Sequence, residues 1–84
     1  MVYYLLVCRS LTYAQRTAAV LERAGIRGQV HRTPKAISPE GCSHCVKIAQ
    51  RNLSDALVVL NRMQLTPKRI YITSGDGSFR EVGL

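Results

Sequence analysis

The sequence predicts an α+β fold in which an antiparallel sheet carries two helices on one face. Three observations support this prediction: segments with strand character alternate with segments of helical character, the apolar positions follow the matching period, and 84 residues are enough for one core only. We therefore expect residues 1–84 to form a single domain.

The first half of the chain predicts a strand, a helix and a second strand. Residues 2–8 are β-branched, aromatic or aliphatic and uncharged, which is typical of a central strand covered on both faces. Thr12 begins a pattern that resembles a capping box, so the first helix is expected to start there and to stop at Gly25. Residues 29–33 alternate weakly and predict the second strand, and Pro34 opens a long loop.

The second half predicts a short strand at 46–49, a helix capped by Asn52 or Ser54, and a strand at 69–73. Residues 74–84 contain a glycine-rich turn signal and an extra edge strand at 79–82. The buried stripe of this second helix is expected to consist of Ala56, Leu57, Val59, Leu60 and Met63.

The resulting order is βαββαβ, which predicts a ferredoxin-like sandwich. In that topology the loop between the second and third strands lies at the same end of the sheet as the start of the first helix. Four basic residues would then surround this loop. They are Arg9, Lys35, Lys47 and Lys68.

The loop between the second and third strands contains the motif Cys42-Ser43-His44-Cys45. Two thiols at this spacing can share one electrophile, one disulfide or one metal ion. A nearby positive field lowers a thiol pKa from its usual value of about 8.5, so more of the reactive thiolate forms at neutral pH. Cys42 is therefore the candidate reactive thiol, and Cys45 the resolving or second carrying thiol. Four further residues are candidate binding residues: His44, Lys47, Lys35 and Arg9.

Other interpretations of these residues stay open. Cys8 lies in the expected core strand and is best explained as a small apolar filler. His44 can act as an acid or base, but a solvent-facing histidine without a role is an equal alternative. A closed zinc site needs four ligands, so Cys42, Cys45 and His44 give only a weak metal alternative, completed between subunits. We expect no resident metal or cofactor.

The composition restricts the class of protein. The net charge of +7 comes from 12 Lys and Arg against 5 Asp and Glu, and these basic residues are scattered through the chain. An odd number of cysteines, no membrane-spanning run and no signal-peptide pattern favour the reducing cytoplasm over secretion or a membrane.

The chain resembles a family of small bacterial proteins of unknown function named for selenium or sulfur carriage. The resemblance rests on segments 24–26, 33–38 and 42–48, with Ser43 where the family usually has glycine and with Glu40 lengthening the loop. It implies a carrier, more than an enzyme, that holds a persulfide or selenyl-sulfide on Cys42. Cys45 would protect or release the cargo during transfer between donor and acceptor proteins. Residues 74–84 exceed the family pattern.

Two other function classes compete with this interpretation. A thiol–disulfide redox module or a regulatory interaction module would use the same cysteines, although we expect a strand after the motif where a thioredoxin-type site has a helix. A nucleic-acid-binding domain would suit the charge, but residues 46–50 contain no aromatic for base stacking, so specific binding is not expected.

Because residues 2–8 need cover on both faces and two helices cover only one, we also expect a homodimer.

Overall fold

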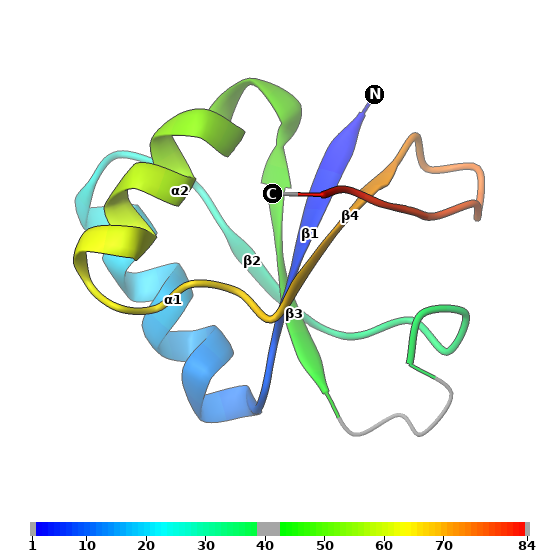
Figure 1. Cartoon of the computed structure of the whole chain (residues 1–84), viewed down its shortest axis with the longest axis horizontal. Helices are drawn as coiled ribbons and strands as arrows, with labels where there is room; N and C mark the ends of the chain where they lie inside the picture. The colour runs from blue at the N-terminus through cyan, green and yellow to red at the C-terminus, as the bar shows by residue number, and fades with distance from the viewer. Residues whose placement is uncertain (1, 39–42, 84) are drawn as a thin grey trace.

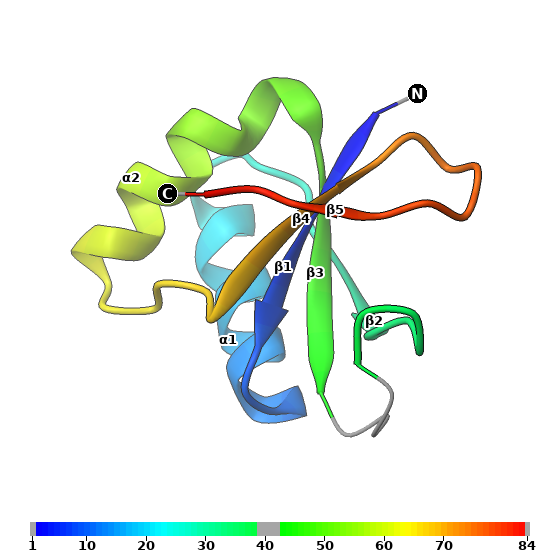
Figure 2. The same ribbon diagram turned by 45° about the vertical axis from the view of Figure 1, so that its right-hand side comes forward.

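The computed structural model describes residues 2–38 and 43–83. The described elements confirm the α+β class, with two helices and a five-stranded antiparallel sheet in the order β2-β3-β1-β4-β5. The central strand is β1, Tyr3–Cys8, as the sequence predicts. Both helices lie on one face of the sheet, and residues 33–38 after β2 and the β4–β5 connection lie on the other (Figures 1 and 2).

The first half of the fold is anchored by caps that the sequence only partly predicts. Helix α1, Leu11–Arg23, is capped by Ser10, whose Oγ accepts a hydrogen bond from the backbone N–H of Tyr13 at 3.2 Å. The cap predicted at Thr12 is therefore wrong by two positions, because Ser10 has the extended backbone that a cap requires. Gly25 has a φ of 83° and ends the helix, as expected.

Strand β2, Gln29–Arg32, forms one edge of the sheet and pairs only with β3. It approaches its neighbours closely at Gly28, where an added Cβ would lie 2.7 Å from Cγ1 of Val46. Only glycine fits this position without displacing Val46. The connection from α1 to β2 can therefore pack this closely on Val46 because residue 28 has no side chain.

Strand β3, His44–Ala49, begins two residues earlier than the sequence predicts. The pairing of β1 with β3 continues to Cys8 and His44, and the pairing of β2 with β3 continues to Arg32 and His44. Neighbours on both sides thus hold His44 and Cys45 in extended conformation. The local sequence around them has turn character, so it did not indicate this extension.

The second half follows through the 3₁₀ turn η1, Gln50–Asn52, helix α2, Leu53–Arg62, strand β4, Arg69–Thr73, and the edge strand β5, Arg80–Glu81. The extra edge strand is confirmed by its antiparallel pairing with β4, over a shorter span than predicted. Met63 does not belong to the buried stripe of α2. It is the C-cap residue and is 54 % exposed.

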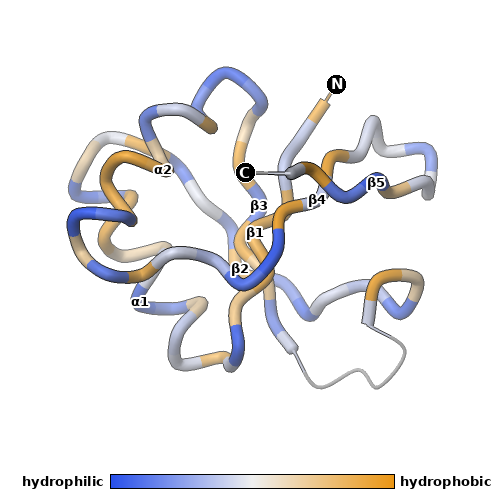
Figure 3. The backbone as a smooth tube through the Cα atoms, in the orientation of Figure 1, coloured by the Kyte–Doolittle hydropathy of each residue, from blue (hydrophilic) through white to orange (hydrophobic). Residues whose placement is uncertain are grey.

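The main core lies between the sheet and the two helices. Its largest fully buried side chains come from every layer: Leu6, Leu21, Val46, Ile48, Leu60 and Ile70. Hydrophobic backbone segments gather where the central strands cross and on the inner side of the helices (Figure 3). A second, smaller cluster on the opposite face contains Leu5, Val7 and Cys45, packed against Ile37, Tyr71 and Phe79. Side chains of β1 therefore alternate between two cores, as its apolar character predicts.

Candidate functional site

Cys45 lies inside β3 and not in the preceding loop. It pairs with Val7 of β1 and His31 of β2, and its side chain is fully buried in the small cluster on the face opposite the helices. The placement expected from sequence, in an exposed turn, is therefore wrong for this residue. Its candidate partner Cys42 lies outside the described residues.

Burial controls the acidity of the Cys45 thiol. Desolvation raises its pKa to about 11, and the nearby hydroxyl of Thr33 offsets only part of this rise. At neutral pH Cys45 is consequently a protonated thiol and a weak nucleophile. A cationic lowering of the pKa, as predicted for Cys42, does not operate on Cys45.

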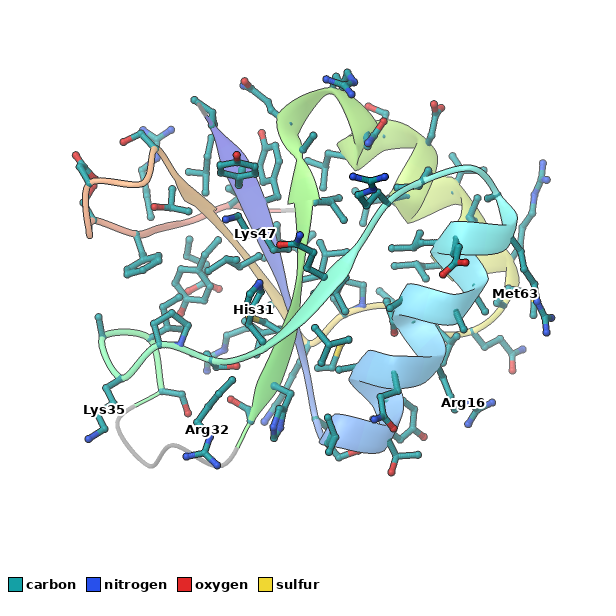
Figure 4. The ribbon with its side chains drawn as sticks, turned by 180° about the vertical axis from the view of Figure 1, so that it is seen from behind. Arg16, His31, Arg32, Lys35, Lys47 and Met63 are labelled. Atoms are coloured by element: carbon teal, nitrogen blue, oxygen red, sulfur yellow. The ribbon has the colours of Figure 1, made fainter. Side chains whose placement is uncertain are left out.

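A hollow of about 360 Å³ lies over this thiol on the face away from the helices. His31, Arg32 and Lys47 bring nitrogen atoms to its lining, and Cys45 and Phe79 also line it. Lys47 and His31 lie on neighbouring strands of this face, with Arg32 nearer the β2–β3 connection (Figure 4). Basic residues from β2 and β3 therefore border the hollow over the buried thiol.

The four basic residues that were predicted to surround the loop are divided between two sides of the sheet. Arg9 and Lys68 line a different hollow, of about 130 Å³, together with Cys8. The guanidinium of Arg9 lies 4.9 Å from the ring centroid of Tyr13. Lys47 alone of the four lines the hollow over Cys45, whereas Lys35 is exposed on the turn after β2 and points outward (Figure 4). Arg9 and Lys68 therefore share a hollow with Cys8, and Lys47 shares one with Cys45. The four basic residues do not gather around a single thiol.

The surroundings of Cys8 agree with a filling role. Its sulfur lies 3.5 Å from the carbonyl oxygen of Leu6 and 3.9 Å from Thr17 Oγ1, inside the helix-side core. Burial raises the pKa of this thiol too. Cys8 is thus packed and protonated at neutral pH.

His44 is the first residue of β3 and is partly buried. Its Nδ1 is buried and has no hydrogen-bond partner within the described part of the chain. An unpaired buried ring nitrogen is costly, so this atom is available to a group that brings a donor or an acceptor. His44 therefore remains a candidate binding residue at the end of the sheet next to residue 43.

Residues 2–38 and 43–83 contain no cluster of three His, Cys, Asp or Glu side chains able to hold a metal ion. The weak metal alternative of Cys42, Cys45 and His44 includes one residue outside that part. In the same part of the chain, neither helix has the length and apolar character needed to cross a membrane.

Sequence reasoning did not identify Arg32, Phe79 or the exposed His31 as residues near the thiol. All three line the hollow over Cys45. The weak alternation of residues 29–33 places Gln29 and His31 on one face, which is a usable signal. Which residue of β3 lies opposite His31 depends on the strand register, and a long loop leaves the register undefined by local sequence.

Comparison with curated proteins and with solved structures finds no match. A family model matches residues 3–72, from the first residue of β1 to within one residue of the end of β4. The match spans both cysteines of the motif and omits residues 74–84, in agreement with the resemblance found in the sequence. The chain therefore belongs to the family described as "Putative Se/S carrier protein-like".

Proposed function

We propose that this protein carries reduced sulfur or selenium as a persulfide or selenyl-sulfide on Cys42, with Cys45 as the releasing thiol. Family membership across residues 3–72 is the observation that carries the proposal. Cys45 is buried and protonated, so its releasing role requires that it leave this position. The strand order β2-β3-β1-β4 with two helices on one face also supports assignment to the ferredoxin-like class.

Loading is a transfer between sulfur atoms. The Cys42 thiolate attacks the terminal sulfur of a donor persulfide, a new S–S bond forms on Cys42, and the donor leaves as a thiolate. Delivery reverses this step, since an acceptor thiolate takes the terminal sulfur and Cys42 leaves as a thiolate. Neither transfer consumes an external oxidant or reductant, and selenium in place of the terminal sulfur follows the same balance.

Release as a free anion uses the second thiol. The Cys45 thiolate attacks the Cys42 sulfur, a Cys42–Cys45 disulfide forms, and hydrosulfide or hydroselenide departs with the electron pair. A thiol reductant then restores the dithiol. Because the pKa of Cys45 is about 11, very little of its thiolate exists at neutral pH. The cargo on Cys42 is consequently protected from premature release until Cys45 leaves its buried position.

This function needs a donor and an acceptor protein and a reducing compartment, for which we propose the cytoplasm. A homodimer is a separate proposal. Ile37 and Phe79 of the same chain already cover part of the face opposite the helices, which reduces the area that a second copy would cover. Light scattering at micromolar concentration tests it, and a monomeric mass would reject it.

Intact-protein mass spectrometry after incubation with a low-molecular-weight persulfide tests the carrier function. We expect the native chain and the Cys45→Ser and Cys8→Ala variants to gain the mass of one sulfur atom, and Cys42→Ser to gain none. The Cys8→Ala variant is the matched control, since it removes a thiol that lies in the helix-side core.

An adduct that persists in Cys42→Ser would reject Cys42 as the carrier. Loss of two protons without an adduct would instead indicate a thiol–disulfide module, and a retained zinc ion would indicate a metal site. Base-specific nucleic-acid binding that survives moderate salt would favour the third class, because weak salt-sensitive binding is expected of any domain this basic.

A further inference from the structure

A second hollow, of about 300 Å³, lies at the other end of β3, away from the cysteine motif. Three cationic side chains line it: Arg27, Lys47 and Arg51. Gln29 and Asn52 add two side-chain amides, and Tyr3 adds an aromatic ring. The positive charge of this hollow comes from segments that are distant in the sequence and adjacent only in the fold.

Arg27 and Arg51 have exposed side chains on backbone that is itself well packed. Arg27 lies between buried Ile26 and Gly28, where the chain packs closely on Val46. Arg51 belongs to η1, whose first residue donates a backbone hydrogen bond to the carbonyl oxygen of Val2 at 3.3 Å. The hollow is therefore formed before any ligand arrives.

Lys47 is held in place, because its Nζ lies 4.0 Å from the ring centroid of Tyr3. The same lysine lines the hollow over Cys45, so it stands between the two hollows (Figure 4). Aromatic contact leaves an ammonium group free to donate hydrogen bonds to a further acceptor.

Within the described residues, no carboxylate lines this hollow. Glu22 lines a neighbouring hollow that Arg27 shares, and Asp55 lies in the first turn of α2. No salt bridge joins Arg27 or Arg51 to either of these carboxylates. The hollow thus carries net positive charge, which favours a bound anion.

We propose that this hollow binds the phosphate group of a small phosphorylated molecule of mononucleotide size. Two guanidinium groups and one ammonium group suit a phosphate, because guanidinium groups bind its oxygens in pairs. A volume of about 300 Å³ lies at the lower end of the range for small-molecule sites. The proposal does not depend on the carrier function, since no cysteine lines the hollow.

The test is an NMR titration of the ¹⁵N-labelled full chain with adenosine 5′-monophosphate and, separately, with inorganic phosphate. Sodium chloride at matched ionic strength controls for screening. We expect saturable shifts of the amides around Arg27, Lys47 and Arg51. Arg27→Gln and Arg51→Gln should each weaken binding about tenfold, because each removes a charge-assisted contact. Arg62→Gln, an exposed change of equal charge in the last turn of α2, should leave binding unchanged within about twofold.

Equal weakening by all three variants would overturn the proposal, since it would show attraction to net charge alone. Shifts that sodium chloride reproduces would overturn it in the same way. A single-stranded oligonucleotide that binds more than about tenfold tighter than the mononucleotide, through Arg27 and Arg51, would reassign the hollow to a nucleic-acid backbone. All of these readouts are independent of sulfur transfer, so failure here leaves the carrier test unaffected.

Discussion

The two faces of the sheet are formed by the same strands but differ in how completely they are covered. The helix-side face is closed by α1 and α2 and buries a large apolar core around Leu6, Ile48 and Ile70. The opposite face has only a small cluster around Leu5, Val7 and Cys45, covered by single side chains from two connections. Of the two hollows that Lys47 borders, the one over Cys45 lies beside this second, thinner cluster, because Leu5, Cys45 and Phe79 belong to both.

This contrast indicates a division between stability and chemistry. A core closed by two helices excludes water and derives its stability from apolar burial. A face covered by connections leaves room for hollows, for charged side chains and for movement of the segments that cover it. Cys45 belongs to the second face and Cys8 to the first, so of these two thiols Cys45 is the candidate for reaction.

The largest expected effect separates the two faces with neighbouring residues of β1. Leu6→Ala removes a fully buried side chain from the helix-side core and should lower the free energy of unfolding by roughly 3–5 kcal/mol. Leu5→Ala should cost about 1–2 kcal/mol less, because Leu5 lines a hollow that can rearrange or admit water. Urea denaturation of both variants measures the difference. Equal costs would contradict the contrast between the faces.

The next effect concerns the buried thiol of the thinner face. The pKa of Cys45 is raised in the folded protein, so the unfolded chain loses this proton first as the pH rises. Stability should therefore fall between about pH 9 and pH 11, by roughly 3 kcal/mol for this residue. The comparison of native protein with Cys45→Ala isolates its contribution, because Cys8 titrates in both. A pH dependence that is identical in the two proteins would show that Cys45 is not buried in solution.

The smallest effect tests how tightly the helix-side face is packed. Gly28→Ala places a Cβ 2.7 Å from Val46 Cγ1 and should lower the free energy of unfolding by about 1–2 kcal/mol. This net cost already includes the gain from the lower conformational entropy of the unfolded chain. Gly83→Ala, with nothing within 4 Å of the added carbon, is the matched control and should change stability by less than about 0.5 kcal/mol. Thermal unfolding of both variants measures the two values. A neutral Gly28→Ala would mean that Val46 can move aside.

Element order was predictable from the sequence, since strand and helix periods are local properties. The burial of both faces of β1, the stop at Gly25 and the added strand near the end all follow from residues within a few positions. The N-cap was less predictable, because Ser10 and Thr12 both have capping side chains. Only the backbone conformation, set by the path out of β1, selects Ser10.

The candidate site was predictable only in its residue types. A cysteine motif with nearby cations is visible in the sequence, and so is its resemblance to a carrier family. The burial of Cys45 was not, because extension of β3 to His44 depends on hydrogen bonds from two other strands. Apolar cover from Ile37 and Phe79 then completes a site that no local pattern around residue 45 encodes.

By itself, the amino-acid sequence determined the strand and helix order, the two-sided character of β1 and the family, because these depend on short-range periodicity and on a short motif. The tertiary structure alone decided which cations lie together and which thiol is shielded from water. Arg27, Lys47 and Arg51 meet, while Arg9 and Lys35 lie elsewhere, because strand register and connection paths set these distances. Charge and acidity depend on such distances and on burial, which no stretch of sequence contains.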